Sequence, residues 1–386
     1  MRCLILNRNY PPNPGVTGAS ADELAQYLIS QGIEVHIVST KGQYAGGGST
    51  EPGHGQVHLV SSLYSGKQKI LRLISNLLEG FLMVRKARSL GIAPWICMTD
   101  PPLLNYWVGN YAHRNHLPWA LWSMDLFPEA FVSAHITSPT NAIYQYLAKA
   151  IQRNIPKLLI ALGPKQAQYI LSKNQWHIAH VELPCGILEP KTNIETPAWA
   201  NSEGKILLGY AGNLGEAHDP RFIEEVLRQM DPSKHRFILS VYGSKAADIL
   251  KLAQNRPEVI ILPSIPQAQL KFIDVHLATL MPHWDHVCVP SKAVSSTCQE
   301  AALLFCGSLD NDNAHLLGQA SWHINPKLSI PIATQVAAFF QSLDQASLQQ
   351  KKMVAASTSK KLREMKVRAF EQIAQFVTQN QTSAGK

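Results

Sequence analysis

The segment 282–300, PHWDHVCVPSKAVSSTCQE, combines residue types that suit the binding of an anion where a helix begins. Pro290 fixes a turn, Ser291 is expected to be the N-cap of the helix, and Lys292 adds a cation beside it. The N–H groups of a helix N-terminus carry about half a positive charge, so the three residues together predict a phosphate site. An ordinary cap followed by a solvated lysine is the alternative.

A second candidate phosphate site is the glycine-rich turn GYAGNLGEAHDP. Gly209, Gly212 and Gly215 recur every three residues after a strand and let the backbone approach a diphosphate closely. Asp219 and Pro220 are expected to be the N-cap and the first residue of the next helix. A purely structural glycine turn is the alternative.

Two further strand ends carry residues that could contact a ligand. One strand ends at Gly243, and Lys245 follows at a helix start, where it adds a second cation unless it is simply solvated. In NPGVTGAS, Gly15 and Gly18 lie between the first strand and its helix. The G-x-G-x-x-G spacing of dinucleotide-binding proteins is absent there, so a nicotinamide-dependent oxidoreductase is not predicted.

The HWDH segment raises the question of a metal site. Two histidines, His283 and His286, flank Asp285 on a loop, but three such residues do not define a coordination shell, so no metal is predicted. Asp285 is expected instead to accept hydrogen bonds from hydroxyl groups next to the phosphate turn. The sequence also lacks a nucleophile elbow and a P-loop.

Strand and helix patterns alternate along the chain, which predicts parallel sheets. The stretch RCLILN is an expected buried strand, and the helix ADELAQYLISQ is expected to begin at a capping box formed by Ser20 and Glu23. The alternation stops in the polar segment 189–204, which is the predicted linker, and then restarts with KILLGYAG.

The sequence therefore predicts an α/β protein with two Rossmann-like, doubly wound domains that face each other across a cleft. The first comprises residues 1–190 and the second residues 191–365. A C-terminal helix, residues 366–386, is expected to pack back against the first domain.

The charge and the cysteines limit the kinds of partner and of cysteine chemistry that the sequence predicts. The chain of 386 residues has a formal charge of +8, spread over both halves without a basic run interleaved with aromatic residues. Nucleic acid is therefore not predicted as a partner, whereas phosphorylated small molecules and anionic lipid are. The six cysteines form no C-x-x-C pair and are expected to be reduced, buried thiols.

Location follows from the hydrophobic pattern. The N-terminus lacks a secretory signal and no long apolar stretch appears, so a cytoplasmic protein is predicted. The amphipathic segment 67–91 has basic residues at both ends and is expected either to pack on the sheet or to bind an anionic membrane, at the inner face of the plasma membrane. These basic residues are Lys67, Lys69, Arg72, Arg85, Lys86 and Arg88.

The landmarks YPPNPGVTGASADELAQYLISQGIEVHIVST, TDPPLLNYWVG, DLFPEAF, GYAGNLGEAHD and VCVPSKAVSSTCQEAALLFCG, in this order, resemble those of retaining glycosyltransferases of the GT-B fold. The resemblance is to family 4, of the bacterial exopolysaccharide and envelope-polysaccharide type, and extends to about Gly307. It implies a nucleotide-diphosphate sugar bound mainly by the second domain, a saccharide or lipid-linked saccharide acceptor bound mainly by the first, and chemistry without a metal or other cofactor.

The resemblance also implies roles for single residues of this chain. Gly18 would approach the donor, and Gly212 and Asn213 would line its diphosphate. Ile265 would meet the base, and Asp285 would contact the donor sugar. The remaining donor-site positions are Gly243, Lys245, Pro290, Ser291, Lys292 and Ser295.

The chain departs from the family pattern at two positions. The acid expected to hold the ribose is Ser295, with Glu300 five residues further on, and the arginine that many members carry is Asn213. In the first domain, Asp125 is the candidate for orienting the acceptor hydroxyl and Glu129 is its rival, although Asp125 as a helix cap is an alternative.

The resulting hypothesis is transfer of a hexose, with glucose favoured, from a uridine diphosphate donor with retention at the anomeric carbon. Lys292, helped by Lys245, would stabilise the departing diphosphate. A sugar-nucleotide epimerase and a catalytically weak binding or scaffold protein are the alternatives.

Overall fold

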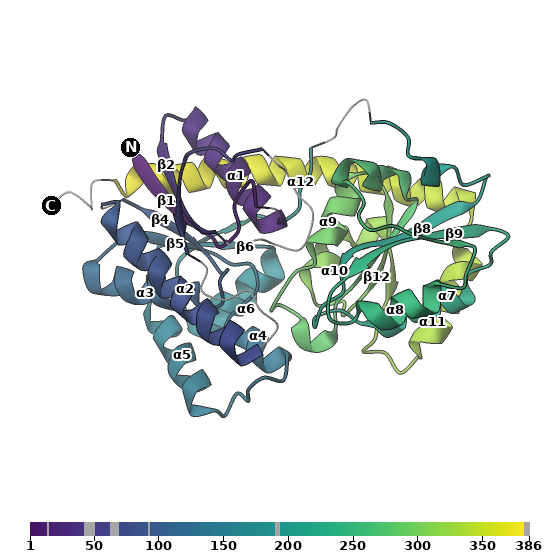
Figure 1. Cartoon of the computed structure of the whole chain (residues 1–386), viewed down its shortest axis with the longest axis horizontal. Coiled ribbons are helices and arrows are strands. Elements are labelled where there is room, and N and C mark those ends of the chain that lie inside the picture. Colours follow the sequence, from purple (N-terminus) through teal and green to yellow (C-terminus); the bar gives the residue numbers. More distant parts are fainter. Residues whose placement is uncertain (14, 42–50, 62–68, 92, 190–193, 382–386) are drawn as a thin grey trace. The chain divides into compact units, whose positions relative to one another are not determined.

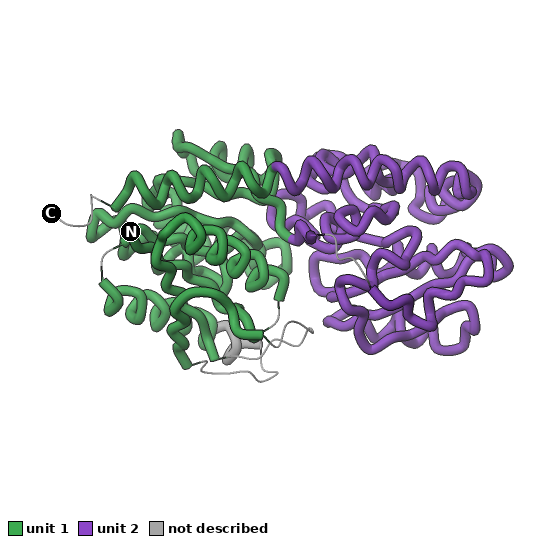
Figure 2. The backbone as a smooth tube through the Cα atoms, turned by 90° about the horizontal axis from the view of Figure 1, so that it is seen from above, with its two compact units in different colours: residues 1–185, 365–386 green, residues 186–364 purple. Residues whose placement is uncertain are grey.

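The computed structural model describes residues 1–13, 15–41, 51–61, 69–91, 93–189 and 194–381, with side chains of 69–73 excepted. The chain divides into two compact units (Figure 2). Unit 1 comprises Met1–Cys185 and Met365–Lys386, and unit 2 comprises Gly186–Glu364. Part of the predicted linker, residues 190–193, lies outside the described residues.

Unit 1 is built on a parallel sheet of seven strands in the order β3-β2-β1-β4-β5-β6-β7 (Figure 1). Its strands are β1 (Arg2–Leu6), β2 (Glu34–Thr40), β3 (Gln56–Val60), β4 (Trp95–Met98), β5 (Trp119–Trp122), β6 (Leu158–Ala161) and β7 (Ala179–Glu182). Its helices are α1 (Val16–Ser30), α2 (Lys69–Ser89), α3 (Leu104–Asn115), α4 (Glu129–Ser133), α5 (Ala142–Arg153) and α6 (Pro164–Asn174). The central strands are completely buried apolar runs, as expected for a sheet covered on both faces.

Unit 2 has a parallel sheet of six strands in the order β10-β9-β8-β11-β12-β13. Its strands are β8 (Ile206–Asn213), β9 (His235–Tyr242), β10 (Val259–Ile261), β11 (Val275–Thr279), β12 (Ala302–Cys306) and β13 (Ser321–Ile324). Its helices are α7 (Pro220–Gln229), α8 (Ala246–Ala253), α9 (Ser291–Cys298), α10 (Asp312–Leu317) and α11 (Ile332–Ser342). Two Rossmann-like sheets were predicted, and this prediction is confirmed.

The helix α12 (Gln345–Gln379) is longer than the predicted C-terminal helix and contributes to both units (Figure 1). Its last turns pack on unit 1, as predicted: the Phe370 ring lies 5.4 Å from the Tyr27 ring, and Lys366 pairs with Glu23 at 3.5 Å. Beyond the helix, the side chain of Gln381 exchanges hydrogen bonds with the backbone of Arg2.

Of two predicted helix starts, one differs from the structure and one agrees with it. The capping box of Ser20 and Glu23 is wrong, because α1 begins one turn earlier at Val16 behind Gly15, whose φ of 150° favours glycine. The predicted cap of α7 is confirmed: Asp219 accepts a hydrogen bond from the N–H of Arg221, and Pro220 is the first helical residue.

The cysteines and the helix lengths relate to two further predictions from the sequence. All six cysteines are buried thiols, as predicted. Among the described helices, none has the length and apolarity needed to cross a bilayer.

Candidate functional site

The candidate donor site lies at the point in unit 2 where the strand order reverses, between β8 and β11. Ligands of open α/β sheets bind at such switch points, beyond the carboxyl ends of the strands. Here β8 ends in Gly212 and Asn213, and the Lys292 Nζ donates a hydrogen bond to the Asn213 carbonyl at 2.7 Å. The Lys292 ammonium also lies 4.1 Å from the centre of the Tyr210 ring and donates to its hydroxyl. The two predicted phosphate motifs therefore meet in one corner of unit 2.

Gly212 keeps this corner open. Its φ is 119°, a conformation that favours glycine, and an added Cβ would lie 3.9 Å from the Lys292 Nζ. The half-buried ammonium has lost part of its hydration, and this desolvation lowers the pKa of Lys292 to about 7. An anion bound beside it would restore a counter-charge and raise that pKa again.

Lys245 supplies a second cation in the same loop region. Its Nζ donates hydrogen bonds to the carbonyls of Glu216 and His218, at 2.8 and 2.9 Å. The preceding Gly243 is required by packing, because a Cβ there would lie 2.2 Å from the Asn213 Oδ1. The side chain of Asn213 is thus held against Gly243, at the position where many family 4 members carry an arginine.

The helix α9 begins at Ser291 and its N-cap is Pro290, without a side-chain cap. The prediction that Ser291 caps this helix is therefore wrong by one residue, because the chain is already helical at Ser291. The consequence favours ligand binding, since a prolyl cap offers no side-chain oxygen to the first N–H groups of the helix.

Ser295 is buried inside the same helix. Its hydroxyl donates a hydrogen bond to the Gly186 carbonyl at 2.9 Å. Gly186 has a φ of 91°, and a Cβ there would lie 2.7 Å from the Ser295 Oγ, so this contact is tightly packed. Contact of Ser295 with a ribose stays a prediction. Because the Ser295 hydroxyl already donates its proton to the Gly186 carbonyl, its oxygen can only accept a hydrogen bond from the ribose. Glu300 lies beyond the end of α9 and is exposed.

The HWDH residues make separate contacts. One Asp285 oxygen, Oδ2, accepts a hydrogen bond from the Lys327 Nζ at 2.8 Å, while the other, Oδ1, is buried without a hydrogen-bond partner. His286 lies 3.8 Å from Asp310, and His283 is exposed. Among the residues that the structure describes, no three His, Cys, Asp or Glu side chains are grouped to hold a metal ion. Contact of Asp285 with a donor sugar stays a prediction, because its unpartnered oxygen, Oδ1, is buried.

His218 is a member of this corner that the sequence patterns did not single out. Burial, together with the Lys292 charge, lowers the pKa of His218 to about 3, so the imidazole is neutral. Its Nδ1 lies 2.6 Å from the Thr279 carbonyl oxygen, so the Nδ1–H group donates a hydrogen bond to that oxygen. The other ring nitrogen, Nε2, then carries no proton and is a hydrogen-bond acceptor. The signal for His218 was its place in the glycine-rich turn, six residues after Gly212.

Ile265, the predicted contact of the base, is partly buried in unit 2. It packs against a small apolar cluster that includes Leu207, Ile238 and Ile273. This placement gives a nucleobase an apolar surface, but the role of Ile265 stays a prediction.

Unit 1 has a different cluster at its own switch point, between β1 and β4. Arg8 follows β1, and its guanidinium donates a hydrogen bond to Glu79 of α2 at 2.6 Å and lies 3.6 Å from Asp100, which follows β4. Asn9 donates to the other Asp100 oxygen at 2.8 Å. Desolvation raises the pKa of Asp100, with Arg8 opposing the shift. Sequence patterns did not identify this cluster, although each member follows a buried strand or lies on a helix that packs on one.

Asp125 lies in the same unit just after β5. Its side chain reaches the surface, yet the surrounding protein partly desolvates it, and this desolvation, with the Asp100 carboxylate nearby, raises the pKa of Asp125 to about 6. Its rival Glu129 begins α4 and is paired with Lys173, whose ammonium also lies near the Tyr144 and Tyr169 rings. The carboxylate of Glu129 is thus committed to a lysine, which favours Asp125 as the hydroxyl-orienting group.

Gly18 is buried within α1. A Cβ at Gly18 would lie 3.0 Å from the Asn9 carbonyl oxygen and 3.3 Å from the Tyr10 Cα, so the glycine lets α1 pack against the loop after β1. This packing explains the glycine without a ligand. Approach of Gly18 to a donor stays a prediction.

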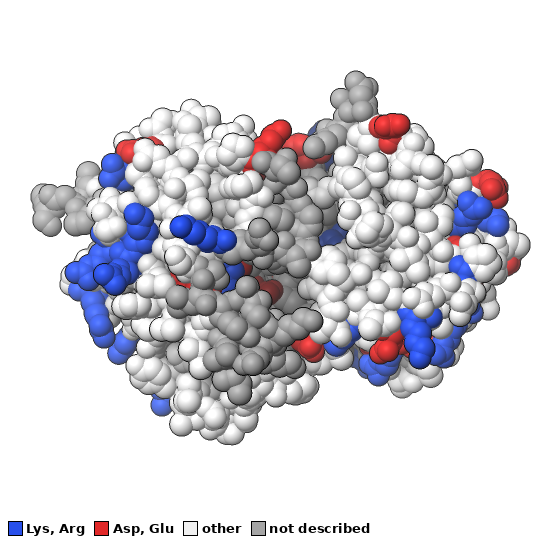
Figure 3. Space-filling view, viewed as in Figure 1, with Lys and Arg blue, Asp and Glu red and all other residues white. Residues whose placement is uncertain are grey.

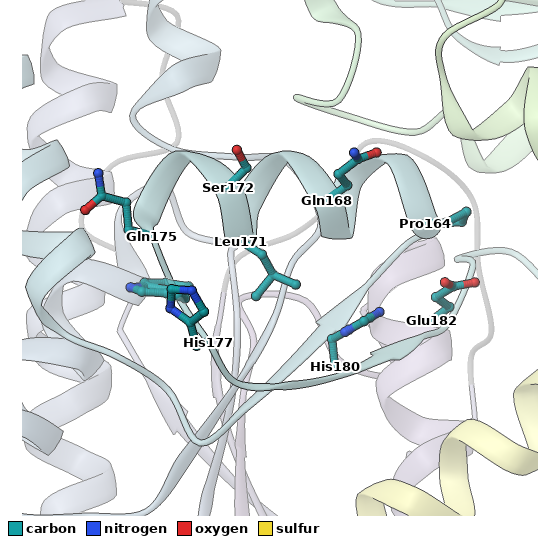
Figure 4. Close-up of a pocket in the computed structure, with 9 residues that line it drawn as sticks. Pro164, Gln168, Leu171, Ser172, Gln175, His177, His180 and Glu182 are labelled. Carbon is teal, nitrogen blue, oxygen red and sulfur yellow. The ribbon is translucent and has the colours of Figure 1, made fainter.

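A pocket of about 550 Å³ lies between α6 and the edge strand β7 of unit 1 (Figure 4). The helix contributes Gln168, Leu171 and Ser172, and the strand side contributes His180 and Glu182. None of the predicted site residues lines it.

Comparisons with known proteins rest on structure alone. No protein-family model matches the chain, and no curated protein matches it in sequence. The structure is similar to that of WaaG, a glycosyltransferase involved in lipopolysaccharide biosynthesis, with a TM-score of 0.64 and 14% identity over 97% of this chain and 99% of WaaG. It is also similar to sucrose-phosphate synthase from Thermosynechococcus elongatus, with a TM-score of 0.64 and 14% identity over 98% of each chain. A third similar structure is HepE of Anabaena in complex with UDP, with a TM-score of 0.62 and 12% identity over 98% of this chain and 100% of HepE. The predicted GT-B fold, with two Rossmann-like domains, is therefore confirmed.

Proposed function

We propose that the chain is a retaining glycosyltransferase that moves a hexose, with glucose favoured, from a UDP-sugar to a saccharide or lipid-linked saccharide acceptor in polysaccharide biosynthesis. The observation that carries the proposal is the corner of unit 2 in which Lys292 lies beside Gly212 and the start of α9. The UDP complex of the structurally similar HepE supports a nucleotide donor.

In the proposed reaction the bond between the anomeric carbon and the diphosphate breaks, and charge develops on the departing phosphate oxygen. Lys292 and the N–H groups at the start of α9 stabilise this charge. Lys245, which is fixed by two backbone carbonyls, adds a second cation. In the proposal the chain's own cations, Lys292 and Lys245, carry this role.

We assign the acceptor to unit 1. Carboxylates accept hydrogen bonds from hydroxyl groups, and among the described residues no lysine or arginine is paired with Asp125, in contrast to Glu129. The acceptor oxygen bonds to the anomeric carbon on the face from which the diphosphate leaves, and its proton passes to the leaving phosphate oxygen. Asp125 orients the hydroxyl during this step.

The experiment is incubation of the protein with UDP-glucose, with and without saccharide acceptors, followed by calorimetry and product analysis. Binding of UDP-glucose, release of UDP and a glycosylated acceptor are expected. A new sugar nucleotide formed from the donor alone would show an epimerase instead. Binding without turnover, for which Asn213 and Ser295 in place of charged residues are the motive, would show a scaffold protein. Absence of UDP-glucose binding would remove the donor assignment.

A further inference from the structure

The loop between β5 and α4, residues 123–128, carries Asp125 but is buried where it begins. Ser123 and Met124 are buried, whereas the Asp125 side chain reaches the surface. A buried backbone outside helices and strands needs hydrogen-bond partners from elsewhere in the chain. The partners of Ser123 and Met124 therefore decide where the loop places Asp125.

Gln166, in the first turn of α6, is completely buried and binds this loop with both ends of its side-chain amide. Its Oε1 accepts hydrogen bonds from the Ser123 hydroxyl at 2.7 Å and from the Leu162 N–H at 2.9 Å. Its Nε2 donates a hydrogen bond to the Met124 carbonyl at 3.0 Å. One side chain of α6 thus holds two successive residues of the loop that leads to Asp125.

Thr99 holds the same loop from the other neighbouring strand. It follows β4 and is buried, and its hydroxyl oxygen accepts a hydrogen bond from the Met124 N–H at 3.0 Å. The strand order is β4-β5-β6, and Gln166 lies in the helix after β6, so the loop after β5 is fixed from both sides. Both backbone groups of Met124 are therefore paired with buried side chains.

The Asp125 carboxylate has no such support of its own. Within the part of the chain that the structure describes, no hydrogen bond or ion pair holds it. Its charged neighbour is Asp100, which itself lies 3.6 Å from Arg8. A carboxylate that is left open for a ligand has to be placed through its own backbone, by residues behind it that are locked in position.

A helix cap alone does not explain Gln166. In a capping box, the side chain of the third helical residue bonds back to the N–H of the N-cap residue. Gln166 makes a similar bond to Leu162, one residue before the N-cap Gly163. Its bonds to Ser123 and Met124 go to a different loop, and α6 does not need them. These two bonds serve the loop of Asp125.

We propose that Gln166, together with Thr99, is a positioning residue for the acceptor: the two side chains fix the backbone of Met124, so that the Asp125 carboxylate meets the acceptor hydroxyl. The inference rests on the proposed function, in which Asp125 orients that hydroxyl. It extends the acceptor site from an exposed carboxylate to two buried side chains that touch no substrate.

The first test is titration of Asp125 in the full chain, labelled with ¹³C at the aspartate carboxyl groups and followed by NMR. The signal is assigned with Asp125→Asn. In the wild type, desolvation and the Asp100 charge raise the pKa of Asp125 to about 6. Gln166→Leu removes both ends of the amide and lets the loop move towards water, so the pKa of Asp125 should fall to about 5 or below.

Thr99 provides a milder variant and its rescue. Thr99→Val removes only the acceptor of the Met124 N–H, and it decides the test if Gln166→Leu does not fold. It should lower the pKa of Asp125 less than Gln166→Leu does. Thr99→Ser keeps the hydroxyl and should titrate like the wild type.

Transfer from UDP-glucose to the saccharide that the wild type glycosylates gives a second readout. In Gln166→Leu, kcat should fall by about tenfold, because a displaced orienting group loses the reactive geometry. The KM for UDP-glucose should stay the same, and the acid limb of the pH profile should move to lower pH with the pKa of Asp125. A role in stability alone would lower the melting temperature and leave both the acid limb and the titration unchanged.

The matched control for the glutamine lies on the same helix. Gln168, two residues further along α6, is exposed and lines the pocket beside β7 (Figure 4). Gln168→Leu therefore removes the same amide from α6 outside the contacts to the loop. It should titrate and transfer like the wild type.

A second control tests surface charge. Figure 3 shows Lys and Arg side chains gathered on the side of unit 1 where Figure 1 places α2 and α3. Of the basic residues that the sequence singled out near α2, Lys67 lies outside the described residues, as do the side chains of Lys69 and Arg72. The control is therefore Arg114→Gln, at an exposed arginine of α3, and it should leave the Asp125 titration unchanged because solvent and salt screen this charge.

An Asp125 titration that is unchanged in both Gln166→Leu and Thr99→Val would overturn the proposal, as would equal shifts in the two control variants. A wild type that neither binds UDP-glucose nor transfers from it would overturn the proposed function instead. The NMR titration needs no substrate, so it would still decide whether Gln166 and Thr99 position Asp125.

Discussion

The two units share a topology but carry opposite chemistry at their switch points. In unit 2 the strand ends are glycine-rich and are bordered by the cations Lys245 and Lys292. In unit 1 the equivalent edge holds Arg8, which Glu79 and Asp100 already neutralise, and Asp125, whose charged neighbour is Asp100. The sheet fixes where a ligand binds, whereas the few residues after the central strands decide its charge.

This difference matches the two substrates of the proposed reaction. A diphosphate needs backbone N–H groups and cations, and unit 2 supplies both. A saccharide hydroxyl needs hydrogen-bond acceptors, and excess carboxylate in unit 1 supplies these while repelling anions. The comparison is therefore consistent with the proposal, in which the donor binds at the edge in unit 2 and the acceptor at the edge in unit 1.

The largest effect is expected for Lys292→Ala, which removes the cation of unit 2. Release of UDP from UDP-glucose should slow by on the order of a hundredfold, because a pre-positioned charge at the departing group is lost. The melting temperature should not fall, since folding withdraws this ammonium from water and lowers its pKa. Lys251→Ala, at an exposed lysine of α8, is the control. An unchanged rate in Lys292→Ala would remove Lys292 from the mechanism.

A smaller effect, roughly thirtyfold on transfer, is expected for Asp125→Asn in unit 1, because general acid–base catalysis contributes about a hundred- to ten-thousandfold and a carboxylate that only orients the hydroxyl should contribute less. Affinity for UDP-glucose should stay the same, since the substitution is not in the donor unit. Glu129→Gln is the matched control, because its carboxylate is paired with Lys173. A greater loss of transfer in Glu129→Gln than in Asp125→Asn would exchange the two roles.

The residues at these two sheet edges can be predicted from the sequence only where they lie together in one short motif. The residues of unit 2 lie in short motifs, so Gly212 and Lys292 were identified from the turn and the helix start alone. Arg8, Glu79 and Asp100 come together only through the order of β1 and β4 in the sheet, which no local pattern encodes. The shared position of Arg8 and Asp100, each two residues after a buried strand, was the signal that could have found them.

Strands and helix starts were likewise predicted where a local sequence pattern determines them and missed where tertiary contacts do. The strand Arg2–Leu6 was predicted to within one residue, as RCLILN, because its apolar residues form a buried run. The edge strand Gln56–Val60 was not predicted, because its side chains are mostly exposed and give no apolar run. The capping box at Ser20 failed because packing of Gly18 on the Asn9 backbone extends α1 towards its N-terminus, and tertiary contact outweighed the local cap.

The profile of kcat/KM against pH should be bell-shaped, because it depends on the ionisation of Asp125 in unit 1 and of Lys292 in unit 2. Asp125, with a pKa of about 6, must be ionised to accept a hydrogen bond from the acceptor hydroxyl, so activity rises as the pH rises through 6. Lys292, with a pKa of about 7 in the free protein, must be protonated, so activity falls as the pH rises above 7, by on the order of tenfold at about pH 8. Lys292→Arg keeps its charge and should abolish the alkaline limb alone. A profile that is flat from pH 5 to 9 would refute both assignments.

The smallest effect is expected for Ser295→Ala, which tests how far the donor edge extends along α9. The Ser295 hydroxyl donates to the Gly186 carbonyl, so its loss leaves a buried acceptor and should lower the free energy of unfolding by about 1 kcal/mol. Affinity for UDP-glucose should change less than twofold if this is the whole role of the hydroxyl, and more if its oxygen also accepts a ribose hydroxyl. Comparison of UDP-glucose with the 2-deoxyribose analogue by calorimetry separates these cases: discrimination that is lost in Ser295→Ala would place the ribose against α9. Discrimination that survives the substitution would leave the donor edge to Gly212, Lys245 and Lys292.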